Sequence, residues 1–310
     1  MDDPSPATRA RLDDLLEIVH EVRQALLARD ESPAGSWVEA TSEALHAGTT
    51  RGWYYPPSAG SGIAFYTVSG PEAYGHVHVA EQSGATERAE RLTGTLLDDL
   101  PPSARSVNIG FTGLSPAHEA ELLGRLSSRP GSTVIQRMAM ERSLGTDDGR
   151  APGPVPEGLA LVPIRAVTVE ALADLDYRSV QGTVDALLIG DRPEEYRRVM
   201  TALLDGSLGR FLEEASTALY QPDPPRLVGA ILSAERSPRK GLFVSFMVDP
   251  DFRRRGHGRF LFRWGLRALW ALGYERVHLW VTADNEPAHR LYTAFRFEPT
   301  VRSTIYRVTR

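Results

Sequence analysis

Alternating apolar and polar positions recur along the chain in short runs, and longer amphipathic stretches separate them. Alternation is typical of half-buried β-strands, whereas apolar residues at three- and four-residue spacing are typical of helices. In the second half of the chain, the pattern predicts strands at 158–164, 216–222, 226–235, 241–249, 276–284 and 303–309. Helices are predicted over most of 168–215, with a break at Gly190, and over 256–272 and 286–294. Antiparallel strands therefore come first, and one β-α-β unit follows them.

The first half of the chain repeats this order of elements. Strands are predicted at 51–57, 62–70, 73–80, 106–114 and 132–144, and helices over 85–100 and 115–128. The halves share no obvious sequence identity, but the common order favours a tandem duplication. A further helix is predicted over 8–29, where these apolar residues recur at helical spacing: Leu12, Leu15, Leu16, Val19, Val22 and Leu26.

The clearest interruption of both patterns is GTDDGRAPGPVPEG, residues 145–158. Gly, Pro and Asp dominate it, and its alternate prolines favour an extended linker. A chain of 310 residues also suits roughly two domains of about 150 residues each. We therefore expect a helical extension at 1–35, a first domain at 36–147, a linker at 148–157 and a second domain at 158–310.

Composition narrows the classes of function. The apolar fraction of 42% is ordinary for a soluble globular protein, and no apolar run reaches the roughly 18 residues of a membrane span. The acidic start, MDDPSPATRARLDD, lacks the apolar region of a signal peptide, so we expect a cytoplasmic protein. The net charge of −5 argues against non-specific nucleic-acid binding, which needs a broad basic surface. Because there is no cysteine, disulfides, thiolate zinc sites and cysteine nucleophiles are excluded.

One stretch gathers positive charge against this acidic balance: DPDFRRRGHGRFLFRW, residues 249–264. It joins the predicted strand 241–249 to a helix that begins at its glycines. The start of a helix exposes unpaired N–H groups and the positive end of the helix dipole. Glycines let the backbone approach an anion closely, and arginines add charge and forked donors. The stretch therefore favours a cradle for a pyrophosphate over a solvated turn.

Three phosphate-binding motifs compete for such a strand–loop–helix unit. A Walker loop ends in Gly-Lys-Ser/Thr, which is absent here. A dinucleotide fingerprint needs Gly or Ala three residues after Gly258, where Leu261 stands, although Asp284 would imitate its ribose-binding acid. The third motif, Arg-x-x-Gly-x-Gly, is present as Arg253, Gly256 and Gly258.

A second motif follows one strand downstream: NEPAHRLY, from Asn285 to Tyr292, and then AFRFEP. With these motifs, residues 241–299 resemble the GNAT superfamily of acyl-CoA-dependent N-acyltransferases, which carries Asn-x-x-Ala-x-x-Leu-Tyr at this place. Arg296 stands where the family usually has glycine. The resemblance implies an α+β fold with two tandem GNAT-like domains, each a mixed, mostly antiparallel central sheet flanked by helices.

The resemblance also implies roles for individual residues, with acetyl-CoA as co-substrate and no metal. The pyrophosphate would be gripped by the loop and the first helical turn: Arg253, Arg254, Gly256, His257, Gly258 and Arg259. The strand backbone of Met247 and Val248 would pair with the pantetheine amides. Asn285 would bind the same arm, Ala288 would leave room beside it, and Tyr292 would act on the sulfur as the catalytic general acid. The plainer alternatives are an exposed spacer at His257 and a core tyrosine at Tyr292.

The acceptor side carries fewer signals. An amine needs a base or a chain of waters to take its proton, yet the strand before the loop, LFVSFMV, carries no carboxylate. Glu235 on the preceding strand is the candidate base, with Glu213 and Glu214 as further candidates, and a surface carboxylate is the plainer interpretation of each. Three residues of the early helices would line an acceptor pocket: Tyr177, Arg178 and Asp185.

The first half of the chain lacks the cofactor motif. Its loop, AEQSGATERA, has one glycine with no arginine before it, and no Asn-x-x-Ala-x-x-Leu-Tyr follows the next strand. His76 and His78 have the spacing of two metal ligands, but no third ligand is evident, so we interpret them as structural. We therefore expect one cofactor site per chain, in the second half.

Two functions stay open. The first is an N-acetyltransferase for a primary amine of a small molecule, of which a sugar amine of thiol metabolism is one case. The alternative is a non-catalytic acyl-CoA-binding or protein-interaction module, which the missing carboxylate favours. In both cases we expect a monomer or homodimer that binds neither nucleic acid nor membrane.

Overall fold

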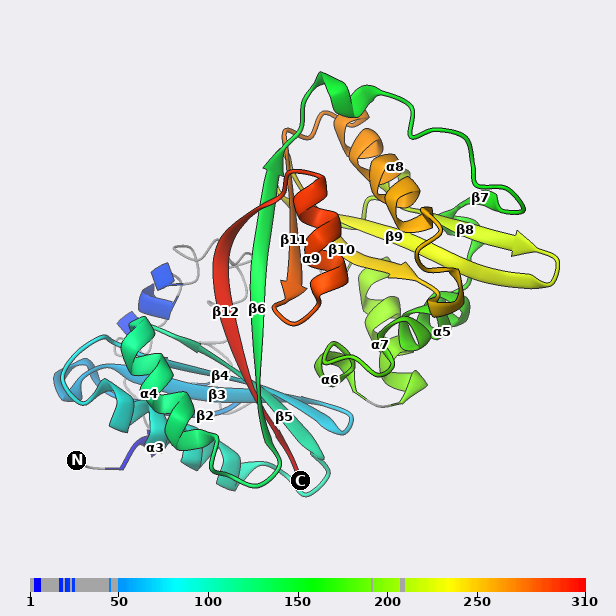
Figure 1. Ribbon diagram of the computed structural model, residues 1–310. Helices are drawn as coiled ribbons and strands as arrows, with labels where there is room; N and C mark the ends of the chain where they lie inside the picture. The colour runs from blue at the N-terminus through cyan, green and yellow to red at the C-terminus, as the bar shows by residue number, and fades with distance from the viewer. Residues whose placement is uncertain are drawn as a thin grey trace. The chain divides into compact units, whose positions relative to one another are not determined.

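The computed structural model describes residues 3–6, 17–18, 20–22, 24–25, 45, 50–190, 192–206 and 210–310. The chain divides into two compact units, coloured along the sequence in Figure 1. Unit 1 is Met1–Arg137 with Arg302–Arg310, and unit 2 is Met138–Val301. Most of the helix predicted over 8–29 lies outside the described residues.

The strands follow the order predicted from the sequence. Those of unit 1 are β1 (Ser5–Pro6), β2 (Arg51–Tyr55), β3 (Gly62–Ser69), β4 (Glu72–Val79) and β5 (Ser106–Thr112). Those of unit 2 are β7 (Ala160–Pro163), β8 (Thr217–Pro222), β9 (Pro225–Ser237), β10 (Lys240–Val248) and β11 (Arg276–Thr282). β6 (Ser132–Ser143) and β12 (Glu298–Thr309) each begin in one unit and end in the other.

The helices also lie where the pattern predicts them. Unit 1 has α3 (Ala85–Asp99) and α4 (Pro116–Leu126); unit 2 has α5 (Val169–Val180), α6 (Ala186–Ile189), α7 (Pro193–Leu204), α8 (His257–Ala271) and α9 (Glu286–Ala294). Polar side chains start two of them: Ser115 caps α4 and Thr168 caps α5, each by accepting a backbone N–H of the first turn. In the described part of the chain, no helix is both long and apolar enough to cross a membrane.

The division into units differs from the domain boundaries expected from the sequence. Unit 1 ends at Arg137, inside β6 and before the expected linker at 148–157. At the other end of the chain, residues 305–309 of β12 pair antiparallel with residues 106–110 of β5. The last strand of the chain therefore completes the sheet of unit 1, an exchange that the order of elements alone does not reveal.

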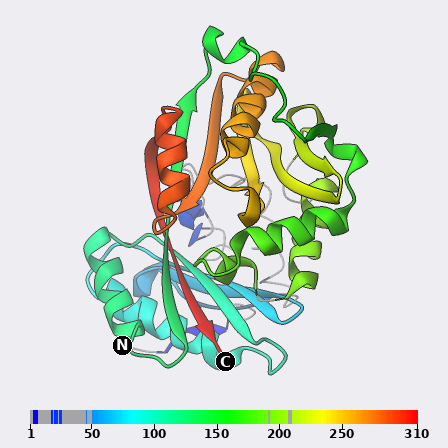
Figure 2. The same cartoon turned by 45° about the vertical axis from the view of Figure 1, so that its right-hand side comes forward.

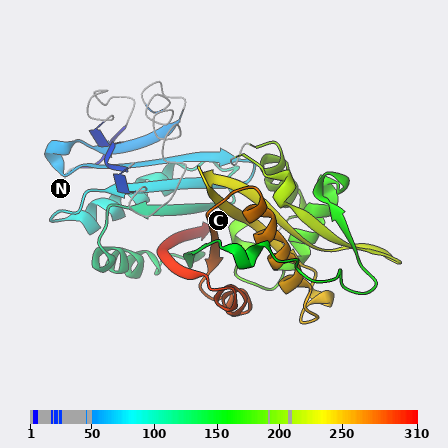
Figure 3. The ribbon, with the colours of Figure 1, turned by 90° about the horizontal axis from the view of Figure 1, so that it is seen from above.

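Unit 1 has the strand order β1-β2-β3-β4-β5-β12. β4 and β5 are parallel, and the other pairs are antiparallel. α3 and α4 lie against this sheet (Figure 3). The helices and the sheet share one apolar core, to which Leu92 and Leu122 contribute. His76 and His78 both hydrogen-bond to Oγ1 of Thr112, at 2.9 and 3.0 Å, which supports their interpretation as structural histidines.

Unit 2 has the strand order β6-β11-β10-β9-β8-β7. β10 and β11 are parallel, whereas β7 to β10 form antiparallel pairs. Neighbouring residues of β9 alternate between two apolar cores: Val228 and Ile231 pack with α8, and Ala230 and Leu232 pack with α5 and α7. Helices therefore cover both faces of this sheet (Figure 2). Because β10 and β11 are parallel, their C-terminal ends reach the same edge.

Candidate functional site

The candidate site begins where β10 and β11 stop pairing. Their last paired residues in the described register are Phe243 and Leu279, although β10 continues to Val248. The opposite edge of β10 stays paired with β9 as far as Val248. Residues 244–248 therefore have one backbone edge open toward β11, where an extended ligand chain can add itself as a strand.

The loop after β10 presents a row of unpaired backbone donors. Within the described chain, the N–H groups of six consecutive residues, 254–259, have no hydrogen-bond acceptor. The first backbone bond of α8 runs from the N–H of Phe260 to the carbonyl of Gly256. Gly256 has a φ of 87°, and a Cβ there would meet no atom within 4 Å. The start of α8 carries the positive end of the helix dipole, and the left-handed Gly256 leaves open space beside it. These features suit the binding of a pyrophosphate.

The first turn of α8 packs closely on β10. A Cβ at Gly258 would stand 3.2 Å from Cζ of Phe246, so glycine permits this approach. His257 is 8% exposed, and its Nδ1 has no hydrogen-bond partner among the described residues. Burial and the charge of Arg255 lower the pKa of His257, so the ring is neutral at neutral pH. An exposed spacer, the plainer interpretation of His257, is therefore wrong.

The arginines of the loop divide into two groups. Arg253 turns back into the protein: its Nε donates to the carbonyl of Val248 at 3.2 Å, and its Nη2 donates to the carbonyl of Ser179 at the end of α5. Arg253 therefore holds the loop after β10 in place, whereas the family resemblance implied that its side chain binds the pyrophosphate. Arg254 and Arg259 are exposed, and their side chains have no partner in the described chain, so they are available to an anion.

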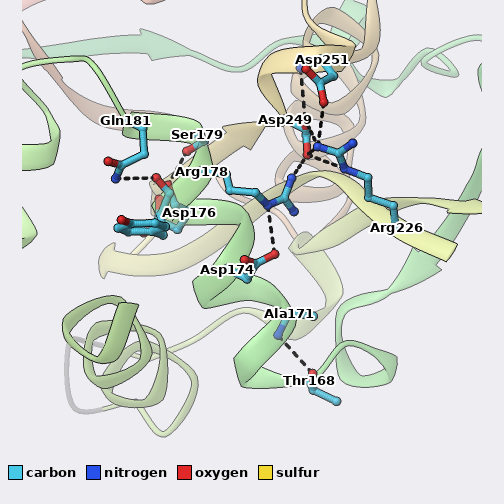
Figure 4. A network of polar contacts seen from close by, with 11 residues as sticks. Thr168, Ala171, Asp174, Asp176, Arg178, Ser179, Gln181, Arg226, Asp249 and Asp251 are labelled. Carbon is cyan, nitrogen blue, oxygen red and sulfur yellow. Dashed lines mark hydrogen bonds and ion pairs between the residues drawn. The ribbon is translucent and has the colours of Figure 1, made fainter. Parts of the chain in front are cut away.

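A buried carboxylate anchors the start of this loop (Figure 4). Asp249 is 0% exposed and forms ion pairs with Arg178 of α5 and Arg226 of β9. Nε and Nη2 of Arg226 donate to its two oxygens at 3.0 and 2.9 Å. One of these oxygens also accepts the N–H of Asp251 at 3.1 Å, which caps the 3-10 turn Pro250–Phe252. Asp249 was not predicted as a functional residue, although its place directly after an apolar strand is a signal in the sequence.

Asn285 connects the start of α9 to the segment after α5. Its Oδ1 accepts the N–H of Ala288 at 3.2 Å and so caps α9. Its Nδ2 donates to Asp185 at 2.8 Å, and Oγ1 of Thr282 donates to the other oxygen of Asp185. The structure thus brings together Asn285, Ala288 and Asp185, three residues that the sequence placed at the site, and it uses the Asn285 amide within the protein.

Tyr292 of α9 lies among aromatic rings. Its ring stacks on Phe262 of α8 with the centroids 5.3 Å apart and the planes 28° apart. The ring of Phe246, which belongs to the open segment of β10, lies 6.5 Å away. Tyr292 is 7% exposed. It is therefore a core aromatic residue that also borders the open edge of β10.

The structure does not bring Glu235 to this site. Glu235 pairs with Gly241 near the start of β10, and the seven residue steps from there to Val248 span roughly 23 Å at about 3.3 Å per residue. Its carboxylate accepts hydrogen bonds from Nε of Arg210 at 2.7 Å and from Tyr274 at 3.0 Å. The bond to Arg210 is the largest effect on the pKa of Glu235 and lowers it. A remote, weakly basic carboxylate does not fit the role of general base.

Unit 1 contains a matching structural contact. Tyr66 of β3 donates to Asp99 at the end of α3 at 2.7 Å, and Nη1 of Arg51 donates to the same carboxylate at 2.6 Å. In unit 2 the carboxylate, Glu235, is on the strand and the tyrosine follows the helix, but the contact again joins an arginine, a tyrosine and a carboxylate. The Glu235 contact is therefore a tie between strand and helix that occurs in both units.

In unit 1 an arginine fills the loop that corresponds to the candidate site. Gly84 precedes α3 with a φ of 78°, as Gly256 precedes α8. Arg88 is buried, and its Nη1 and Nη2 donate to the carbonyls of Ser83 at 2.9 Å and Ala80 at 3.4 Å. The carbonyl oxygens of Ser83 and Ala80 point toward Arg88 inside the loop, and such oxygens would repel a bound anion. Among the described residues of either unit, no group of three or more His, Asp or Glu side chains is placed to hold a metal ion.

Comparison with known proteins gives the class of this protein. Residues 184–297 match the family model described as the Acetyltransferase (GNAT) family. This segment contains the open edge of β10, the 249–256 loop, α8 and α9, so the part of unit 2 that carries the candidate site is similar to the GNAT acetyltransferases, a class of acyltransferases.

Individual relatives extend the likeness over nearly the whole chain. A mycothiol acetyltransferase of Clavibacter michiganensis subsp. michiganensis is 27% identical over 301 residues, which cover 96% of this chain and 88% of that protein. A GCN5-related N-acetyltransferase from Sphaerobacter thermophilus has a TM-score of 0.62 at 16% identity and covers 97% and 94% of the two chains. A tandem GNAT protein from the clavulanic acid biosynthesis pathway has a TM-score of 0.55 at 14% identity and covers 98% and 97%. The predicted α+β fold with tandem GNAT-like domains is confirmed.

Proposed function

We propose that this protein is an N-acetyltransferase that transfers the acetyl group of acetyl-CoA to a primary amine of a small molecule. The observation that carries the proposal is the row of six unpaired N–H groups at 254–259, which follows directly on the open edge of β10. Both features lie inside the segment that matches the family model, and GNAT proteins generally use acetyl-CoA. The reaction is direct attack of the amine on the thioester in unit 2, with one site per chain.

The residues of this site would divide the binding of acetyl-CoA among them. The N–H groups of 254–259 and the side chains of Arg254 and Arg259 would hold the pyrophosphate. The backbone of Met247 and Val248 would pair with the pantetheine arm, as an added strand does. Acetyl-CoA supplies the acyl group as a thioester, whose carbonyl carbon is open to attack by an amine.

Tyr292 is proposed as the general acid of the transfer. Expulsion of a thiolate is assisted when a phenol protonates the sulfur or stabilises its charge. The place of Tyr292 beside Phe246 and the open edge of β10 supports this role, although its ring also packs in the core. The acceptor is proposed as a small amine, and the similarity to a mycothiol acetyltransferase supports an amine of thiol metabolism as one candidate.

The proposal is tested by incubating the protein with acetyl-CoA and a panel of primary amines that includes an amino sugar, an amino acid amide and a polyamine. Thiol release is followed with a thiol-reactive dye, and acetylated product is identified by mass spectrometry. We expect thiol release that depends on one class of amine. Binding of acetyl-CoA without amine-dependent thiol release from any member of a broad panel would favour a non-catalytic acyl-CoA-binding module.

A further inference from the structure

Asp176 of α5 is a buried carboxylate to which the roles above give no task. It is 6% exposed and lies on the face of α5 that packs on β9 and β10, together with Leu172 and Leu175. In the described part of the chain, no side chain or N–H group donates a hydrogen bond to its carboxylate. A carboxylate this deeply buried is ordinarily paired, because burial of an unpaired charge costs free energy.

Two contacts place the end of α5 at the candidate site. Arg253 of the loop donates to the carbonyl of Ser179, one turn after Asp176. Asp185, which follows α5, is bonded to Asn285 at the start of α9, and the charge of Asp185 acts on Asp176. Asp176 therefore belongs to a segment that contacts the loop after β10 on one side and the start of α9 on the other.

Among the residues that the structure describes, no cation forms an ion pair with Asp176. Arg178 binds Asp174 and Asp249, and Arg253 binds two backbone carbonyls. Burial, and after it the charge of Asp185, raises the pKa of Asp176 to about 7. The charged groups on α5 and the elements around it are Glu170, Asp174 and Arg178 on α5, Asp185 after it, Glu194, Glu195, Arg197 and Arg198 on α7, Arg226, Glu235 and Arg236 on β9, Lys240 on β10, and Asp249, Asp251, Arg253, Arg254 and Arg255 in the loop. Residues 244–248 of β10 carry no charge.

We propose that Asp176 is the general base of the acyl transfer and takes a proton from the attacking amine. This role rests on the proposed function. As the bond between the amine nitrogen and the acetyl carbonyl carbon forms, an N–H proton passes to the Asp176 carboxylate. The C–S bond then breaks with its electron pair on sulfur, which takes a proton from Tyr292, and Tyr292 regains one from water. Asp176 releases its proton to water, so one amine and one thioester give one amide and one thiol.

The environment of Asp176 suits this task. A general base is most effective when its conjugate acid has a pKa near the working pH, and a fully solvated aspartate is too weak for that. A carboxylate without a fixed hydrogen-bond donor also keeps both oxygens available to a substrate proton. The missing carboxylate of β10 is thereby supplied from α5.

The experiment compares Asp176→Asn, which keeps the shape of the side chain, with the wild-type protein and an accepted amine. Rates are measured from about pH 5.5 to about pH 9, under conditions where chemistry limits turnover. We expect kcat near neutral pH to fall at least tenfold, the affinity for acetyl-CoA to stay unchanged, and the acidic limb of the pH profile to disappear. Asp174→Asn is the matched control, since Asp174 lies on the same helix with its side chain 64% exposed, and it should keep both turnover and the acidic limb.

The outcomes separate this role from the proposed function. Wild-type kcat with an unchanged acidic limb in Asp176→Asn would overturn the role and leave the transferase intact. Asp176→Glu restores a carboxylate and should restore the acidic limb of the pH profile. If Asp176→Asn and Asp176→Glu both lose rate but both keep the acidic limb, the substitutions have damaged the structure, and this result also overturns the role. A wild-type protein that binds acetyl-CoA and acetylates no amine would overturn the proposed function and this role with it.

Discussion

Nδ2 of Asn285 donates a hydrogen bond to Oδ2 of Asp185 at 2.8 Å. The contact joins the start of α9, which carries the second family motif, to the segment after α5. Because Thr282 donates to the other oxygen, both oxygens of Asp185 are held. Residues a hundred positions apart in sequence thus fix the segment after α5 to the start of α9.

The loop after β10 is expected to depend on the buried charge of Asp249. Asp249→Ala leaves Arg178 and Arg226 without their shared partner, and removal of one member of a buried ion pair typically costs about 3–5 kcal/mol. Asp251→Ala is the matched control, because the side chain of Asp251 binds the same Arg226 but is 70% exposed, and an exposed pair contributes at most about 1 kcal/mol. Unfolding by denaturant measures the free energy of unfolding of both variants. An equally small loss in Asp249→Ala and Asp251→Ala would contradict the anchoring role of Asp249.

Tyr292→Phe removes only a hydroxyl and keeps the ring that stacks on Phe262. General acid assistance typically contributes about 10²–10⁴-fold, and water can replace part of it, so we expect kcat to fall at least roughly tenfold. Titration with acetyl-CoA should show little change in affinity. A variant with wild-type kcat, measured where chemistry is rate-limiting, would leave Tyr292 as a core residue alone.

Asp176→Asn is expected to stabilise the protein more as the pH rises. Burial raises the pKa of Asp176 from 3.8 to about 7, so between these values the folded protein keeps a proton that the unfolded chain releases. The contribution of this bound proton to the free energy of unfolding is complete below about pH 4 and is lost as the pH rises toward about 7. Asparagine has no such proton, so the difference in melting temperature should grow from about pH 5 to about pH 8. Calorimetry at several pH values checks this, and a difference independent of pH would argue against the raised pKa.

Glu235→Gln is expected to leave kcat within about twofold of wild type. The carboxylate lies at the far end of β10 from the loop, and the hydrogen bonds from Arg210 and Tyr274 occupy it. A general base would lose at least roughly tenfold on this change, as we expect for Asp176→Asn. Steady-state measurement of kcat decides whether Glu235 is a general base or a structural carboxylate. Glu214→Gln is the control for the loss of one surface charge.

The sequence indicated the elements and the loop of this protein because those depend on local patterns. The helix over 286–294 and the left-handed glycine before α8 follow from residue types at fixed spacing. The direction of a side chain depends on distant contacts instead. Arg253 reads as a phosphate ligand in sequence, but the carbonyl of Ser179, far back in the chain, accepts its hydrogen bond. Asp176 is one of the two acids in DLDYRSV, and only the packing of α5 on the sheet separates it from its exposed neighbour Asp174.

The pairing of the last strand was beyond local reasoning for the same reason. β12 has the alternation of any half-buried strand, and nothing in that pattern specifies β5 as its partner. The boundary of unit 1 therefore had to come from the structure.

The central claim is one acetyl-CoA site per chain, held by the loop 254–259, and calorimetric titration of acetyl-CoA into Gly256→Asp tests it most directly. The substitution places a carboxylate among the unpaired N–H groups. Gly158→Asp is the matched control, because Gly158 also has a positive φ, 74°, and open space around it but lies outside the site. We predict one site per chain in wild type and Gly158→Asp, and at least roughly tenfold weaker binding in Gly256→Asp, since a charge-assisted contact to an anion contributes about 1.5–3 kcal/mol. Two equivalent sites per chain, or unchanged affinity in a folded Gly256→Asp variant, would contradict the claim.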